Sequence, residues 1–118
     1  MISSTPAPPY YAVIFTSIHS DQDAGYAKMN DLLSGILRDQ PGYLGMESVS
    51  GEIGITVSYW QNLDSILAWK NQKDHQLAQN KGKQQWYDQY KVRICKVERD
   101  YSFEGVNHTR TTKNNPSF

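Results

Sequence analysis

The chain has 118 residues, with 12 lysines and arginines balanced by 12 aspartates and glutamates, and this length suits one domain. The charge pattern holds no basic block, so it predicts neither a nucleic acid nor an anionic membrane as a partner. The start of the chain lacks the pattern of a signal peptide and no apolar run approaches a membrane span, so we expect a cytoplasmic protein. Cys95 is the single cysteine, which excludes an internal disulfide, and its strand-like neighbours predict a buried thiol.

The first regular elements are a strand and a helix. Residues 1–9 are rich in Ser and Pro, and we expect them to form a flexible segment before the domain. Residues 10–18 are dense in aromatic and β-branched side chains at both odd and even positions, which is typical of a strand covered on both faces. Ser20 can cap a helix whose apolar side chains repeat at helical spacing as far as Leu37. This helix must end before Pro41, because proline disfavours helical geometry in the residue that precedes it.

A hairpin and a second helix follow. Residues 43–50 and 53–60 predict two strands, and the short connection between them permits antiparallel pairing. Asn62 can cap the next helix, whose apolar face continues until Gly82 stops or bends it. A further helical turn would carry Trp86 before the last strand-like run begins.

The last strand completes a known topology. Residues 92–101 predict a fourth strand, and residues 104–118 form a polar tail that is either mobile or docked on a partner. The domain, residues 10–103, therefore has the order strand, helix, strand, strand, helix, strand. This order predicts a ferredoxin-like α+β fold, a split βαβ unit with both helices on one face of a four-stranded antiparallel sheet. In the strand over residues 53–60, neither the odd-numbered nor the even-numbered side chains are all polar, so neither face of the sheet suits full exposure to water. We therefore expect a homodimer joined through the sheet faces that the helices leave uncovered.

One short stretch concentrates the residues that could form a site. Trp69, His75, Gln79 and Trp86 fall near helical multiples, and Tyr87 follows directly. On one helix these side chains would share a stripe and build an aromatic-walled pocket with one imidazole. The alternative is that both tryptophans fill the core and that the histidine lies on the surface.

Several short motifs occur together in this chain and carry a family resemblance. They are Gln40-Pro41-Gly42-Tyr43-Leu44-Gly45, Ser58-Tyr59-Trp60, Trp69, His75 with Ala78-Gln79, Trp86-Tyr87, Arg93 and Glu98-Arg99. Together they resemble the antibiotic biosynthesis monooxygenase (ABM) domain family. The resemblance implies a dimeric α+β barrel of two ferredoxin-like units, with a pocket in each subunit between the helices and the sheet.

The resemblance also implies an activity, because some members oxidise polycyclic phenols to quinones with molecular oxygen and no cofactor. We therefore expect a monooxygenase that acts on a small aromatic or quinol-like substrate and needs neither a metal nor a nucleotide. A histidine with a pKa near neutrality can remove the phenolic proton, and indole rings can hold a flat ring by stacking. The expected catalytic residues are His75 and Trp69, and the expected substrate-binding residues are Trp86, Tyr87, Tyr59, Ser58 and Arg93.

The sequence is compatible with two other functions. The haem-degrading branch of the family relies on a strand-one Asn, a helical Trp and a later helical His. Here only Trp69 carries over, because Gln79 holds the ligand position and His75 lies one turn earlier. A non-catalytic, stress-associated module that binds a small molecule is the other alternative.

Two residues also have structural interpretations. Arg93 could pair with Glu47 or Glu98 across the sheet instead of contacting a phenolate. Trp60 is expected to pack in the core or at the dimer interface.

Overall fold

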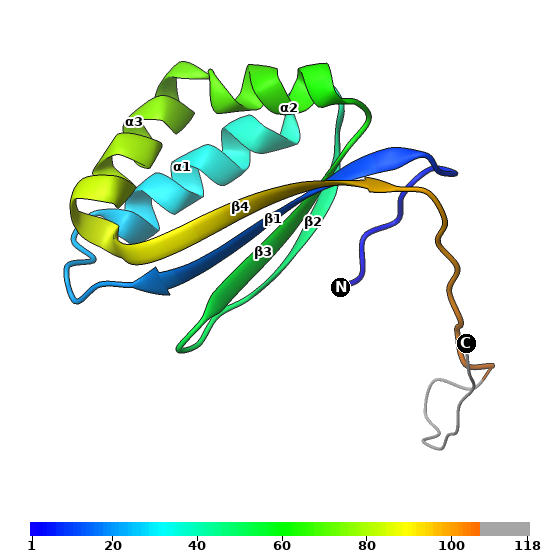
Figure 1. Ribbon diagram of the computed structural model, residues 1–118, viewed down its shortest axis with the longest axis horizontal. Helices are drawn as coiled ribbons and strands as arrows, with labels where there is room; N and C mark the ends of the chain where they lie inside the picture. The colour runs from blue at the N-terminus through cyan, green and yellow to red at the C-terminus, as the bar shows by residue number, and fades with distance from the viewer. Residues whose placement is uncertain (107–118) are drawn as a thin grey trace.

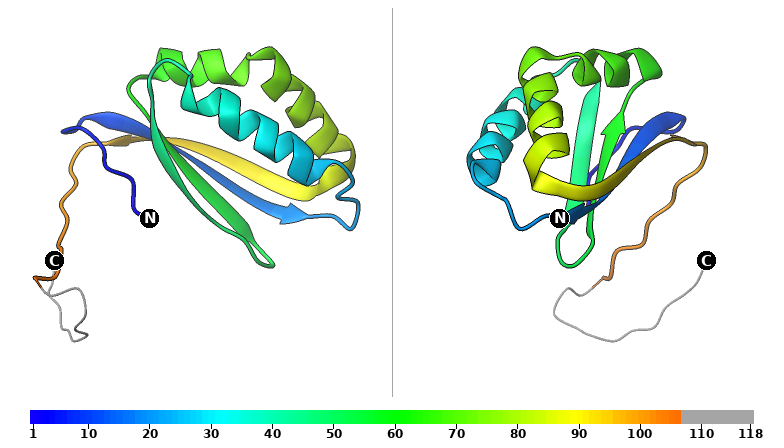
Figure 2. Two further views of the ribbon diagram at one scale, coloured as in Figure 1. Left: turned by 180° about the vertical axis from the view of Figure 1, so that it is seen from behind. Right: turned by 60° about the vertical axis from the view of Figure 1, so that its left-hand side comes forward.

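The computed structural model describes residues 1–106 and consists of one antiparallel sheet with its helices on a single face (Figures 1 and 2). The four strands lie in the order β2-β3-β1-β4. This arrangement confirms the predicted ferredoxin-like α+β fold. The elements are β1 (Tyr10–His19), α1 (Tyr26–Arg38), β2 (Tyr43–Val49), β3 (Gly54–Trp60), α2 (Leu63–Lys70), α3 (Lys73–Lys81), the π-helical turn η1 (Gly82–Trp86) and β4 (Tyr87–Val97).

The strand register divides the sheet residues between two faces. Trp60 stacks on Trp69 of α2, so the parity of Trp60 marks the helix-facing side. In β1 this parity holds Tyr11, opposite Trp60, and Val13, opposite Ser58. The alternate residues belong to the other side, which we call the open face, because successive strand side chains point in opposite directions.

The second helical region is broken in two, which differs from the single helix expected. Asn62 caps α2 by accepting from the backbone N–H of Ser65, as predicted. A new start follows at Gln72, whose side chain accepts from the backbone N–H of His75 and caps α3. Gly82 has helical angles, φ −59° and ψ −46°, and the chain continues through the π turn to Trp86. The fourth strand therefore begins directly after this turn, earlier than the sequence pattern indicated.

The first helix also begins differently from the sequence prediction. Gly25 is its N-cap, with φ 82° and no capping side chain. Ser20 instead bonds the backbone carbonyl of Gln85, which ties the end of β1 to the π turn.

The most buried side chains lie between the sheet and the helices, at opposite ends of the helix-facing side. Trp60 is fully buried, at 0% exposure, near the β3–α2 connection. Trp86 is 3% exposed at the far end, where the π turn meets β4. Burial of two indoles supplies much of the apolar area that stabilises a chain of this size.

The open face is only partly covered. Near one end, the hydroxyl of Tyr10 bonds to Asp100, and the backbone N–H of Ser3 donates to Glu47, so both terminal segments contact the sheet there. Elsewhere on this face Ile55 and Cys95 are exposed. The prediction of a buried thiol is therefore wrong for the single chain, because no helix covers this side of β4.

Beyond β4 the chain leaves the sheet as an extended segment (Figure 1). The described helices include none that is long and apolar enough to cross a membrane.

The turn before β2 provides a test of the fold. Gly42 has φ +84°, and a Cβ there would lie 2.0 Å from Ser65 Oγ and 2.6 Å from Ser65 Cβ. We expect Gly42→Ala to lower the free energy of unfolding by about 1–3 kcal/mol through backbone strain and this clash. Gly35 lies inside α1 with no atom within 4 Å of the added Cβ, so Gly35→Ala should instead raise that free energy by about 0.5–1 kcal/mol. Urea denaturation of both variants measures this difference, and a shift in the same direction for both would contradict the assignment.

Candidate functional site

A column of aromatic rings stands on the helix-facing side of the sheet. Trp69, in the last turn of α2, lies over Trp60 with ring centroids 6.4 Å apart and an angle of 28° between the rings. Tyr43 packs edge-on against Trp60 at 5.5 Å. The indole Nε1 of Trp60 donates to Ser58 Oγ at 2.9 Å, which satisfies the only polar atom of this buried ring. The base of the column is therefore held by packing and by a hydrogen bond.

His75 lies on top of this column because the helix breaks just before it. Its imidazole stacks on the Trp69 ring at 4.3 Å with an angle of 13°, and its Nδ1 lies 2.8 Å from the Trp69 carbonyl oxygen. A carbonyl oxygen can only accept, so Nδ1 carries the proton and Nε2 keeps its lone pair. Among the described residues no group bonds Nε2.

The charge state of His75 follows from its surroundings. Burial lowers the pKa of His75 below its usual value, and the hydrogen bond to Trp69 opposes this effect only in part. The imidazole is therefore neutral at pH 7, with one nitrogen fixed and the other available as a proton acceptor.

Gln79 holds the two helices together next to this histidine. Its Nε2 donates to the Lys70 carbonyl oxygen at 2.9 Å, across the break between α2 and α3. The same Nε2 lies 3.4 Å from His75 Nδ1, but that nitrogen is already committed to the Trp69 carbonyl. Gln79 thus stabilises the geometry in which His75 stacks.

A second aromatic cluster occupies the opposite end of the helix-facing side. The rings of Tyr87 and Tyr90 in β4 contact the ring of Phe15, with centroids 5.4 and 5.1 Å away. Trp86 packs on Tyr26 at 5.4 Å and donates from Nε1 to the Ala24 carbonyl oxygen at 3.0 Å.

Two of the expected substrate-binding residues therefore lie away from His75. Trp86 is a buried anchor of the π turn, and burial together with a hydrogen bond to Tyr26 raises the pKa of Tyr87. The expected common stripe of Trp69, His75 and Trp86 does not form, because the helix break changes the register between them.

Tyr59 and Arg93 lie on the open face, across the sheet from His75. Tyr59 alternates with Ser58 and Trp60, and its hydroxyl donates to Glu47 Oε1 at 2.6 Å. Burial and this bond raise the pKa of Tyr59 to about 12, and the same bond lowers the pKa of Glu47.

Arg93 is exposed and pairs in register with Ile14. Within the described residues it forms an ion pair with neither Glu47 nor Glu98. Strand alternation thus separates both residues from the histidine, whereas Ser58 of β3 and Tyr87 of β4 lie on its side of the sheet.

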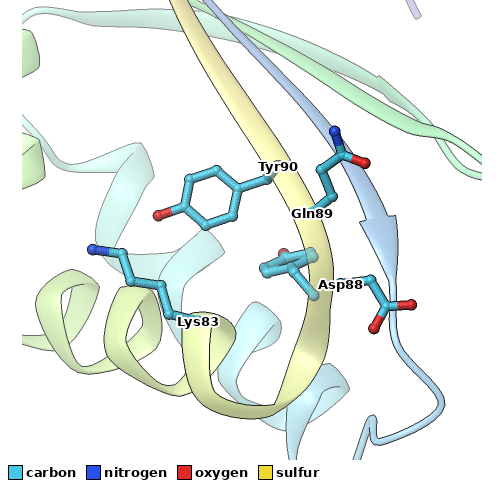
Figure 3. A pocket seen from close by; sticks show the side chains of 5 residues that line it. Lys83, Asp88, Gln89 and Tyr90 are labelled. Atoms are coloured by element: carbon cyan, nitrogen blue, oxygen red, sulfur yellow. The ribbon is translucent and has the colours of Figure 1, made fainter.

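The space between the two clusters is open along β4. Val92 is 45% exposed and Ile94 is 54% exposed, although their register opposite Phe15 and Val13 places them on the helix-facing side. The helices pack mainly over β2 and β3, so the helix-facing side of β4 is open to solvent, and we call this uncovered strip beside the helices the cleft. A hollow of about 310 Å³ near the end of β4 that follows η1 is lined by Lys83, Tyr87, Asp88, Gln89 and Tyr90 (Figure 3).

Sequence reasoning missed several residues of this cleft. Phe15 and Tyr90 could have been found from the antiparallel register of β1 with β4. Trp60 packs in the core, which is one of the two interpretations proposed for it from the sequence. His19, which contacts Tyr26 at 4.7 Å, gave no such signal because it falls at a strand end. The described residues contain no group of three or more His, Cys, Asp or Glu side chains that could hold a metal ion.

Comparisons with known proteins agree with this architecture. Residues 9–81 match the family model described as antibiotic biosynthesis monooxygenase. Uncharacterized protein YqjZ of Bacillus subtilis is 47% identical over 105 residues, which cover 87% of this chain and 92% of that protein.

Solved structures are similar in fold at low sequence identity. Rv0793 from Mycobacterium tuberculosis superposes with a TM-score of 0.69 at 9% identity, covering 79% of this chain and 99% of that chain. SnoaB from Streptomyces nogalater, described as a cofactor-independent oxygenase, has a TM-score of 0.66 at 7% identity and covers 79% of this chain and 97% of its own.

The environment of His75 predicts a pH effect on stability. Because the folded state lowers the pKa of His75 from 6.5, the unfolded chain binds a proton more readily. The free energy of unfolding should therefore fall as the pH drops below 6.5, until the pH passes below the folded pKa. NMR titration of the imidazole should place its pKa below 6.5, and His75→Gln should show a weaker loss of stability over this range. A titration at or above 6.5 would contradict the burial of the ring.

Proposed function

The chain belongs to the antibiotic biosynthesis monooxygenase family, and we propose that it oxidises a small aromatic or quinol-like substrate with molecular oxygen and without a cofactor. The observation that carries this proposal is His75, a neutral imidazole with Nδ1 fixed by a carbonyl and Nε2 left as a base. The fold that the chain shares with the cofactor-independent oxygenase SnoaB supports the proposal.

The reaction requires from the protein a base and an aromatic surface from which the bound substrate displaces water. His75 Nε2 accepts the phenolic proton, and the resulting phenolate passes an electron to oxygen. Recombination places both oxygen atoms on the ring carbon as a peroxide, which takes the proton back from the imidazolium. Loss of the hydrogen from that carbon with cleavage of the O–O bond then releases water and leaves a carbonyl. In total, a phenol and one molecule of oxygen give a quinone and water, and the electrons that reduce the oxygen all come from the substrate.

Trp69 acts mainly as a positioning residue in this proposal. Its ring lies roughly parallel to both Trp60 and His75, and its carbonyl fixes the imidazole tautomer. The substrate ring would then approach Nε2 from the solvent, on the side of the sheet that also holds Ser58 and the exposed Val92.

We also propose a homodimer through the open face, which would complete a dimeric α+β barrel. The exposed Ile55 and Cys95 on this face support it, as do Phe103 and Val106 of the extended C-terminal segment. These apolar side chains have no cover in the single chain, and a second copy offers the matching surface.

A haem-binding function is a second candidate for the same histidine. Its single supporting observation is that Nδ1 bonds a backbone carbonyl, as in many metal-ligating histidines, so Nε2 would be the iron ligand. Haem bound there would supply the oxygen-activating iron, with Trp69 against the ligand ring.

Oxygen uptake tests the proposed base. With a panel of hydroquinones and polycyclic phenols, the native chain should consume oxygen, and His75→Ala should lower the rate by about 100-fold or more. The rate should also fall at acidic pH, with its midpoint below 6.5 because burial lowers the pKa of His75. Gln76→Ala, which changes an exposed neighbour on α3, serves as the control and should keep the native rate.

The same variants separate the alternative functions. Unchanged turnover in His75→Ala would remove the histidine from the mechanism. Fluorescence quenching by the phenols without oxygen uptake would instead favour a non-catalytic binding module. A Soret shift on haemin titration that disappears in His75→Ala would favour the haem-binding candidate.

Sedimentation equilibrium tests the dimer. Ile55→Asp places a charge in the centre of the open face and should weaken self-association by about 100-fold or more. Leu67→Asp, at an exposed position on α2, should leave self-association unchanged. A native chain that stays monomeric at micromolar concentration would refute the proposed assembly.

A further inference from the structure

The extended segment over residues 98–106, which we call the C-terminal arm, leaves the sheet on the side opposite to the helices. Figures 1 and 2 show it running away from the sheet past the open face. Its start is held in place, because the carboxylate of Asp100 accepts from the hydroxyl of Tyr10. Further along, Phe103 is 83% exposed and Val106 is fully exposed. The arm thus presents apolar side chains that no part of residues 1–106 covers.

The open face has a groove at the end remote from the arm. The groove has a volume of about 330 Å³ and lies where β1 ends, next to the β2–β3 hairpin and β4. The register opposite Thr16 places Lys91 on the open face, and Arg93 follows at the same parity. Ile18 and Ile53 supply apolar surface to the groove and are 38% and 54% exposed. Within the described residues neither cation has a carboxylate partner, so the groove combines free positive charge with exposed apolar area.

The charges of the arm are opposite to those of the groove. Residues 98–104 carry three carboxylates and one arginine, whereas the charged side chains that line the groove are Lys91 and Arg93. A second copy turned about a two-fold axis perpendicular to the strands places the arm end of each chain over the groove end of the other. An axis along the strands would instead bring the two cationic ends together, which like charges disfavour. Charge complementarity therefore selects the first arrangement.

The arm is long enough to reach the groove of a second copy. Packed sheets lie about 10 Å apart, and an extended chain rises about 3.3 Å per residue. Three residues separate Asp100 from Phe103, so this part of the arm spans about 10 Å from the point where Tyr10 holds it. Phe103 then reaches the level of the second sheet, and Glu104 follows one residue later.

We propose that the C-terminal arm of each copy docks in the open-face groove of a second copy of this chain. Phe103 covers Ile18 and Ile53 of the groove, and Glu104 pairs with its two cations. The proposal rests on the self-association proposed above, and it adds the segment and the site that hold the two copies together. By symmetry each dimer contains two such contacts.

Charge reversal tests the pairing, with sedimentation equilibrium as the measurement. Glu104→Lys and Lys91→Glu should each weaken self-association by about tenfold, because each places like charges at the contact. A chain that carries both substitutions should return to within a few-fold of the native association, since opposite charges then face each other again. Lys96→Glu makes the same charge change on the helix-facing side of β4, opposite Tyr11, and should keep the native association.

Disulfide formation between two different chains tests the position of the arm. Both chains carry Cys95→Ser, and one also carries Phe103→Cys while the other carries Ile53→Cys. Mild oxidation of the mixture should give a linked heterodimer on a non-reducing gel, because a disulfide forms only between side chains that lie close together. Leu67→Cys, at an exposed position on α2, replaces Ile53→Cys as the control and should give no linked product.

The outcomes separate the arm contact from the dimer itself. A native chain that stays monomeric would overturn both. A native dimer that neither charge reversal weakens would overturn the arm contact and leave the sheet-face dimer in place. Phe103→Cys that links to Leu67→Cys as readily as to Ile53→Cys would likewise overturn the arm contact alone.

Discussion

The hydrogen bond between His75 Nδ1 and the Trp69 carbonyl determines most of what this cleft can do. That carbonyl also accepts from the backbone N–H of Gln72 at 3.1 Å, and its second lone pair accepts from the imidazole. The break is held by Gln72, which caps the second helix, and by Gln79, which bonds back to Lys70. In a continuous helix the six residues from Trp69 to His75 would span about 1.7 turns, so the imidazole would point away from this carbonyl and keep either tautomer. The interruption of the helix thus gives the histidine a defined proton and a defined lone pair.

Strand alternation separates the two surfaces that the sheet must provide. Along β3, Ser58 and Trp60 serve the helix side, and Tyr59 between them serves the open face. The same alternation in β4 gives Val92 to the cleft and Arg93 to the opposite surface. Since each side chain reaches only one side, a change designed to alter self-association on the open face leaves the cleft in place. This separation is the physical reason that the proposed catalysis and the proposed self-association can be tested independently.

The order of elements was predictable from the sequence, because alternation and helical spacing are properties of short segments. The candidate site was predictable only in part. Trp69 and His75 were identified together, but through a continuous helix that does not exist, and they meet instead across a break capped by a glutamine. Glutamine is an unusual cap, so the pattern before His75 gave no signal of a second helix start. Arg93 and Tyr59 are grouped with the histidine by chemical type. The parity of Tyr59 relative to Trp60 already places it on the other face, whereas the side of Arg93 follows only from its register with Ile14 in the folded sheet.

The openness of the cleft follows from the mismatch between a long strand and short helices. β4 runs from Tyr87 to Val97, whereas the helices on this side of the sheet lie mainly over β2 and β3. The helix-facing side chains of β4 therefore remain exposed from Val92 onward, although the strand itself is fully paired to β1. Apolar side chains in such a position favour a flat apolar ligand over water. A rigid polycyclic ring would cover Val92 and Ile94 with little loss of conformational entropy, and it would exclude water from His75, whose pKa burial already lowers. The exposed strand and the neutral base thus favour the same class of ligand.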